Sequence, residues 1–279
     1  MLVEKKTFDE ERVLYGQNNI AVKNCVFQGK ADGESPLKEC TNVFVRDSLF
    51  DLRYPFWHNT NTFIQNCDFT QNCRAPFWYS NTVHIENSSL SGIKAFRECN
   101  KIEIQNSSVK SDEFGWFCKD INIHDGAVNS EYFLFNSSNI KMNNIMLDGK
   151  YSFQYTKKGS ILNSTLNTKD AFWHAKNLVI KNCIVNGEYL GWYSQNLTFI
   201  NCRISGSQPF CYCKNLKLIN CSMEGCDLAF EKSSVNGNIS TLKSVKNFYK
   251  GKITSLSVVE EIKDDPKAKG KIILSDLNL

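Results

Sequence analysis

Charged residues and histidines, which could bind a ligand or act in catalysis, recur beside short Phe-Trp and Gly-Trp dipeptides in this chain. Aromatic rings next to bases and carboxylates suit a sugar chain, because apolar sugar faces rest on aromatic rings while sugar hydroxyls seek charged partners. We therefore expect a carbohydrate-binding surface in these segments. The candidate ligand-binding residues are Arg53, Trp57, His58, Trp78, Tyr79, Arg97, Glu98, Trp116, Trp173, His174, Trp192 and Tyr193.

The same segments supply candidates for catalysis. A lyase needs a base near an acidic substrate group, and a glycoside hydrolase needs two carboxyl groups. No serine or cysteine nucleophile comes with a convincing partner, and His58 and His174 are too far apart in the repeat described below to form a dyad. The sequence leaves open whether the protein is an enzyme. The candidate catalytic residues are Lys94, Arg97, Glu98, Lys169, Asp170 and His174.

A 19-residue repeat must position these side chains. Asn or Asp recurs at this interval, with an apolar residue two positions before it and another three positions after it. Asn and Asp tolerate left-handed backbone angles, so they suit a corner that every turn must make. The corner residues with strict spacing are Asn87, Asn106, Asp125, Asn144, Asn163, Asn182, Asn201 and Asn220.

This repeat predicts an all-β fold, a single-stranded right-handed parallel β-helix. Looser spacing extends the frame back to Asn24, which gives about 11 coils of 19 residues, each with three short strands. An α-solenoid would need helical periodicity, which the chain lacks. We expect one domain over residues 1–279, with a cap at 1–18, coils at 19–233, and an irregular last coil and cap at 234–279.

The third strand of each coil decides which rings reach solvent. The position nine residues after the corner is never polar, which predicts that it points inward. The next position holds tryptophans together with Arg97 and Gln154, which favours an outward orientation. The opposite phase stays open, since a one-residue slip exchanges the two faces. An outward phase predicts an exposed aromatic stripe, and such patches bind ligands or partners. The alternative is that the rings only pack under loops or across strands.

Composition restricts the other partners. The formal net charge is +4, from 33 Lys and Arg against 29 Asp and Glu that are interspersed, so a nucleic-acid partner is not predicted. The chain has no apolar stretch long enough to cross a membrane and no signal-peptide pattern, so we expect a cytoplasmic protein. The 12 cysteines are then expected to be reduced and buried, and no metal or cofactor is predicted.

Four motifs carry a resemblance to a known family. They are KADGES at 30–35, LRYPFWH at 52–58, DAFWHAKN at 170–177 and EYLGWYS at 188–194. With these motifs the chain resembles the bacterial domain-of-unknown-function family DUF3737 over nearly its whole length. The resemblance implies a right-handed β-helix similar in architecture to pectate lyases. It implies no established activity and supplies no catalytic residues.

Three functions therefore remain to be compared with the structure. The first is a module that binds a carbohydrate or similar polyhydroxylated ligand along the aromatic stripe. The second is a carbohydrate-active enzyme of the polysaccharide lyase or glycoside hydrolase type. The third is a protein-interaction scaffold whose stripe docks a partner or a second copy, which predicts a homodimer that dissociates when Trp173 is replaced by alanine.

Overall fold

A computed structural model describes residues 1–275 of the chain. These residues form β-strands joined by turns and contain no helix. The strands follow a parallel β-solenoid path of about 14 turns of roughly 19 residues. The chain divides into two compact units, residues 1–141 and residues 142–279, and each is described by itself.

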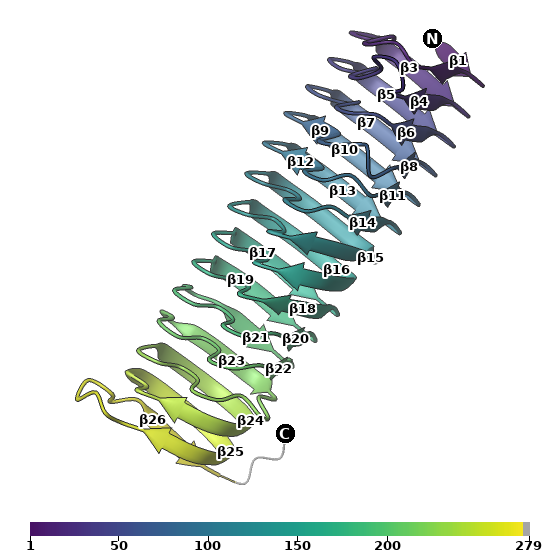
Figure 1. The fold of residues 1–279 in the computed structure, drawn as a ribbon. Coiled ribbons are helices and arrows are strands. Elements are labelled where there is room, and N and C mark those ends of the chain that lie inside the picture. The colour runs from purple at the N-terminus through teal and green to yellow at the C-terminus, as the bar shows by residue number, and fades with distance from the viewer. Residues whose placement is uncertain (276–279) are drawn as a thin grey trace. The chain divides into compact units, whose positions relative to one another are not determined.

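In unit 1, each turn contributes one longer and one shorter strand, and each strand pairs in parallel with its counterpart in the next turn (Figure 1). The longer strands are β1 (Leu2–Glu4), β3 (Asn18–Lys23), β5 (Thr41–Arg46), β7 (Thr60–Gln65), β10 (Asn81–Glu86), β13 (Asn100–Gln105) and the first half of β15 (Lys119–Glu131). The shorter strands are β2 (Thr7–Phe8), β4 (Val26–Gln28), β6 (Leu49–Asp51), β8 (Asp68–Phe69), β11 (Ser89–Leu90) and β14 (Ser108–Lys110), followed by the second half of β15.

Unit 2 repeats the arrangement. Its longer strands are β17 (Lys157–Leu162), β19 (Lys176–Lys181), β21 (Thr198–Ile200), β23 (Leu216–Cys221), β24 (Ser234–Lys246), β25 (Lys250–Ile262) and β26 (Lys271–Leu274). Its shorter strands are the end of β16 (Ser138–Lys150), β18 (Thr165–Lys169), β20 (Ile184–Asn186) and β22 (Arg203–Ser205).

The predicted corner is confirmed. All 11 corner residues from Asn24 to Asn220 have a positive φ, between 47° at Asn106 and 57° at Asp125. In unit 2 the corner amides also form a hydrogen-bonded ladder, in which Asn201 Nδ2 donates to Asn182 Oδ1 at 3.2 Å. The Asn therefore supplies both the backbone conformation and a side-chain link between turns.

Stacked phenylalanines fill the core of each unit. In unit 1, Phe77 lies 5.1 Å from Phe56 and 4.7 Å from Phe96 between ring centroids, and all three rings are fully buried. In unit 2, Phe153 and Phe172 stack at 5.0 Å. The residues nine positions after the corner therefore point inward, as expected. The 12 cysteines are free and buried.

Two details differ from the expected coil. On the third side of the coil, the described residues form regular strands only at β9 (Phe77–Trp78) and β12 (Phe96–Arg97). Elsewhere this side is a turn in which core rings such as Phe172 have a positive φ, a costly conformation that their full burial holds in place. The turn count rises from 11 to about 14 because both ends continue the repeat: β1 pairs with β3, and β24 pairs with β25.

Candidate functional site

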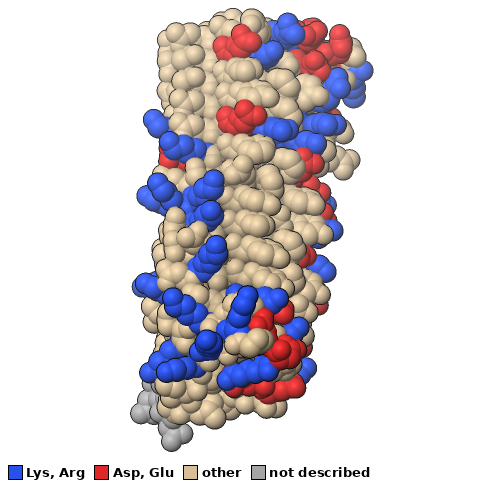
Figure 2. All heavy atoms as spheres, turned by 90° about the vertical axis from the view of Figure 1, so that its left-hand side faces the viewer, with Lys and Arg blue, Asp and Glu red and all other residues tan. Residues whose placement is uncertain are grey.

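The third side of the coil carries an aromatic surface in each unit, and in unit 1 this side contains β9 and β12. The five tryptophans are half-buried and lie outside the core, so the outward phase is the one observed. Figure 2 shows a band of uncharged residues on this side with charged side chains at its margins. We define the unit 1 aromatic face as Trp57, His58, Trp78, Tyr79, Arg97, Glu98, Trp116 and Phe117. We define the unit 2 aromatic face as Tyr155, Trp173, His174, Trp192, Tyr193 and Tyr212.

Hydrogen bonds to the next turn fix the tryptophans. Trp78 Nε1 donates to the Lys94 carbonyl at 2.8 Å, and Trp173 Nε1 donates to the Tyr189 carbonyl at 2.8 Å. Gln154 occupies a tryptophan position and makes the equivalent bond, from Nε2 to the Asp170 carbonyl at 3.2 Å. The indole N–H groups are therefore used within the protein and serve to orient the rings.

The rings of each face stack on one another. In unit 1, Trp57 and Trp78 are 5.2 Å apart with planes 3° from parallel. In unit 2, His174 lies 4.7 Å from Tyr155 and 5.1 Å from Tyr193, with both interplanar angles 9°. No sugar ring fits into such a gap. The expectation that sugars rest on indole faces is therefore corrected: within a ladder the faces cover each other, and ring edges point to solvent.

Arg97 and Glu98 interrupt the ladders of unit 1. The Arg97 guanidinium lies 5.2 Å from the Trp78 ring and 5.9 Å from the Trp116 ring, so it fills the place of a missing indole. Its Nε is 3.8 Å from Glu98 Oε1, and among residues 1–275 this buried nitrogen has no hydrogen-bond acceptor. Beside it, Lys94 pairs with Glu113 at 3.2 Å. The charges of this face are therefore balanced.

The catalytic candidates of unit 2 do not converge. Lys169 pairs with Glu188 at 3.4 Å. Burial raises the pKa of Asp170, with Glu188 adding to the rise and Lys169 opposing it. Burial, and next the charge of Lys176, lowers the pKa of His174. In the described part of the chain no hydrogen bond or ion pair joins His174 to Lys169 or Asp170. These groups therefore do not form an acid–base pair in this structure.

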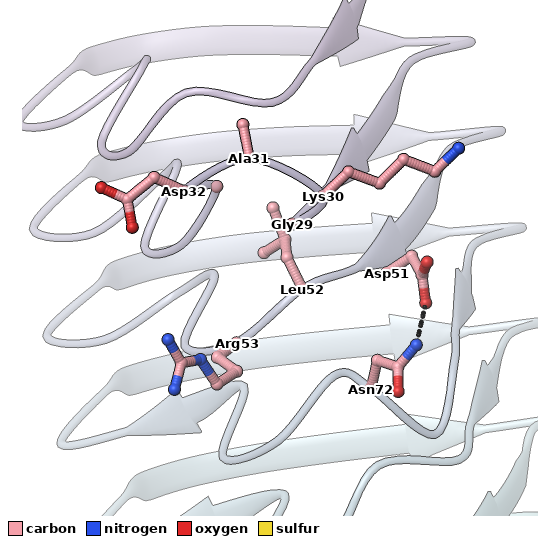
Figure 3. A pocket seen from close by; sticks show the side chains of 9 residues that line it. Gly29, Lys30, Ala31, Asp32, Asp51, Leu52, Arg53 and Asn72 are labelled. Carbon is pink, nitrogen blue, oxygen red and sulfur yellow. Dashed lines mark hydrogen bonds between the residues drawn. The ribbon is translucent and has the colours of Figure 1, made fainter.

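Arg53 lies in a cleft of about 390 Å³ formed with loop 29–33 (Figure 3). It pairs with Glu34 at 2.8 Å. Figure 3 shows Arg53 and Asp32 on one side of this cleft and Lys30, Asp51 and Asn72 on the other. Because the charged groups point apart, they do not converge on one ligand atom.

One exposed aromatic residue of these faces, Phe117, was missed from the sequence, although it stands at the same position of the repeat as Tyr79 and Tyr193. Tyr155 and Tyr212 share that position in the sequence, and in the structure both stack in the unit 2 ladder. Across residues 1–275, no group of three or more His, Cys, Asp or Glu side chains is placed to hold a metal ion. The same residues include no helix suited to crossing a membrane.

Three solved structures illustrate what this chain is similar to. The tailspike protein 3 of bacteriophage CBA120 has a TM-score of 0.53 at 10% identity, with 95% of this chain and 54% of the tailspike covered. The chain thus spans about half the length of that protein. The A-module of the Azotobacter vinelandii mannuronan C-5 epimerase AlgE6 has a TM-score of 0.40 at 10% identity, covering 95% of this chain and 92% of the module.

The tailspike of E. coli bacteriophage HK620, solved with a hexasaccharide, has a TM-score of 0.39 at 10% identity, covering 91% of this chain and 61% of that chain. At 10% identity, the likeness to the CBA120 tailspike shows a shared fold and nothing about activity. No curated protein matches the sequence significantly. The model of one family, described as "Protein of unknown function (DUF3737)", matches residues 1–274. The chain therefore belongs to the DUF3737 family.

Proposed function

We propose that the protein binds a carbohydrate chain, or a similar polyhydroxylated ligand, along its aromatic faces. One observation carries this proposal: the ladder Tyr155–His174–Tyr193–Tyr212 exposes ring edges in an unbroken row. Tyr155 is 41% exposed and Tyr193 is 47% exposed, so these rings are accessible to a ligand in a contiguous row.

The stacked geometry specifies how such a ligand would bind. Ring edges offer C–H groups with partial positive charge, and these suit the oxygen-rich surface of a sugar. No described residue hydrogen-bonds the hydroxyl of Tyr79 or Tyr193, so both are free for ligand hydroxyls. The rungs repeat at about 4.8 Å, the spacing of adjacent strands. A long chain with regularly spaced hydroxyls matches this surface better than a single compact molecule does.

Titration of the native protein with a panel of oligosaccharides, followed by isothermal calorimetry, tests the proposal. We expect Tyr193→Ala to weaken binding at least tenfold, because the change removes a central rung. Tyr193→Phe keeps the ring and loses only the hydroxyl, so a smaller loss is expected. Ile219→Ala is the matched control, since Ile219 is 45% exposed on β23, away from the ladder. Equal effects of Tyr193→Ala and Ile219→Ala would contradict the proposal.

A second copy of the chain is the competing occupant of these faces. Sedimentation velocity distinguishes the two. A monomer that binds a sugar supports the proposal. A dimer that dissociates with Trp173→Ala and binds no sugar would replace it by a self-association role.

A further inference from the structure

A row of lysines borders the unit 2 aromatic face. Each stands two residues after a rung of the ladder: Lys157 follows Tyr155, Lys176 follows His174, and Lys214 follows Tyr212. Lys157 and Lys176 are register partners in β17 and β19. Bridges then connect Lys176 to Gln195 and Gln195 to Lys214. The positions of this lysine row thus follow the ladder turn by turn, with Gln195 between Lys176 and Lys214.

These lysines have no acidic partners. Within residues 1–275, no carboxylate lies within ion-pair distance of Lys157, Lys176 or Lys214, and all three are exposed. Two nearby acidic groups of unit 2 already have other lysine partners, since Glu188 pairs with Lys169 and Glu231 pairs with Lys246. Figure 2 shows basic side chains along a margin of the uncharged band.

Such a row does not stabilise the fold. Like charges placed directly opposite each other on neighbouring strands are unfavourable. The chain has a neutral alternative one position later, where Asn196 Nδ2 donates to Asn177 Oδ1 at 2.8 Å and Asn215 continues the amide ladder. At the position of the lysine row, unit 1 has a run of neutral residues, in which Asn100 Nδ2 donates to Asn81 Oδ1 at 3.4 Å, and then one lysine, Lys119, opposite Asn100. Repeated, unpaired positive charge beside an exposed ladder fits a ligand that repeats negative charge.

We propose that the unit 2 aromatic face binds an anionic polysaccharide, whose acidic groups pair with Lys157, Lys176 and Lys214 while its sugar rings lie along the ring edges of the ladder. This inference rests on the proposed carbohydrate-binding function and adds the chemical class of the ligand. Single-stranded nucleic acid is the other polyanion of suitable length. It binds aromatic side chains by stacking its bases on their faces, and the faces of His174 and Tyr193 are already covered by their neighbours in the ladder.

The decisive comparison uses one sugar backbone with and without its charge. We would titrate the full chain with oligogalacturonate and with the same oligomer fully methyl-esterified, at low and at physiological salt. The expected result is at least tenfold tighter binding of the acid form, with affinity that falls as salt rises. Dextran sulfate against dextran forms a second arm, which tells sulfate recognition from carboxylate recognition.

Charge-neutral variants assign the effect to the row. Lys157→Gln with Lys176→Gln should weaken binding of the acid form five- to twentyfold and reduce its salt dependence. Lys181→Gln with Lys252→Gln removes two exposed, unpaired lysines of unit 2 outside the row and should change affinity less than twofold. Circular dichroism and thermal melting confirm that both double variants fold.

The remaining outcomes separate the two proposals. Equal binding of the acid and esterified oligomers, or binding of neutral sugars alone, would overturn the anionic class and leave the carbohydrate function intact. Binding of none of the sugars would overturn both. Tight binding of poly(U) that depends on the lysine row, without binding of acidic sugars, would also overturn the inference.

Discussion

The two aromatic faces are built on the same repeat and differ in the chemistry they present. In unit 1 the ladders are interrupted by Arg97 and Glu98, and Lys94 has Glu113 as its partner. In unit 2 the Tyr–His–Tyr–Tyr ladder is unbroken, and its neighbouring lysines are unpaired. Corner and core residues fix the scaffold, so surface positions can change without altering the path of the chain. The charged groups of the unit 1 face thus contact rings or one another, whereas the three lysines beside the unit 2 ladder are available to a ligand.

If the scaffold is shared, core substitutions must act alike in both units. Phe77→Ala in unit 1 and Phe172→Ala in unit 2 each remove a fully buried, stacked ring. We expect each to lower the free energy of unfolding by about 3–5 kcal/mol in urea titrations. Phe44→Ala, at a 38% exposed ring, should cost far less. A large loss in one unit and a small loss in the other would show that the cores are not equivalent.

Substitutions at Arg97 test whether this residue stabilises unit 1 by packing between the two neighbouring indoles. Arg97→Ala removes cation–π contacts with two indoles, so we expect a loss of about 1–2 kcal/mol in the free energy of unfolding. Arg97→Trp should recover this loss, because the gap on each side of Arg97 is close to the spacing of stacked indoles elsewhere in the ladder. A tryptophan variant less stable than the alanine variant would argue against this account.

The pH response of unit 2 depends on His174. Its pKa is lowered in the folded protein, so the unfolded chain binds a proton more tightly. Stability from this group is therefore complete above the unfolded value, about 6.5, and declines as pH falls below it. We expect His174→Tyr, which extends the tyrosine ladder, to lose less stability between pH 8 and pH 5.5 than the natural protein does. Parallel urea titrations at the two pH values measure this difference, and identical losses would contradict it.

The smallest expected effect contrasts a paired with an unpaired lysine. Lys94→Gln removes an ion pair with Glu113 and should lower the free energy of unfolding by about 0.2–1 kcal/mol at low salt. Lys176→Gln removes a like-charge neighbour of Lys157, so stability should stay unchanged or rise by a few tenths of a kcal/mol. Both effects should shrink in 1 M salt. Destabilisation by Lys176→Gln would mean that the row serves the fold.

Much of the fold could be predicted because each turn repeats the same physical solution. The Asn corner, the apolar residues around it and the inward phenylalanines all occur at fixed positions in the 19-residue frame. The ends were harder to predict, since β1 and β24 to β26 follow the path without a strict spacing. On the third side, the sequence analysis predicted a strand in every coil, whereas most coils have a turn there. The positive φ at residues such as Phe172 and Phe210 cannot be recognised from the residue type.

The sequence predicted where the candidate site lies on the coil, and it did not predict how the aromatic rings pack there. The outward tryptophans follow from the presence of Arg97 and Gln154 at the same position. That their faces are covered follows only from the ring spacing and parallel planes of the folded ladder. The spacing of the row lysines can be read from the repeat. That these lysines lack acidic partners follows only from the register and ion pairs of the structure.

Backbone amide NMR of the native protein during titration with oligogalacturonate and neutral oligosaccharides would be the most informative experiment. If the unit 2 aromatic face binds sugar, saturable shift changes should cluster in the segments 155–157, 174–176, 193–195 and 212–214, with the outward face of β23 around Ile219 unaffected. Saturable changes centred elsewhere, or none with any sugar, would contradict the proposed function.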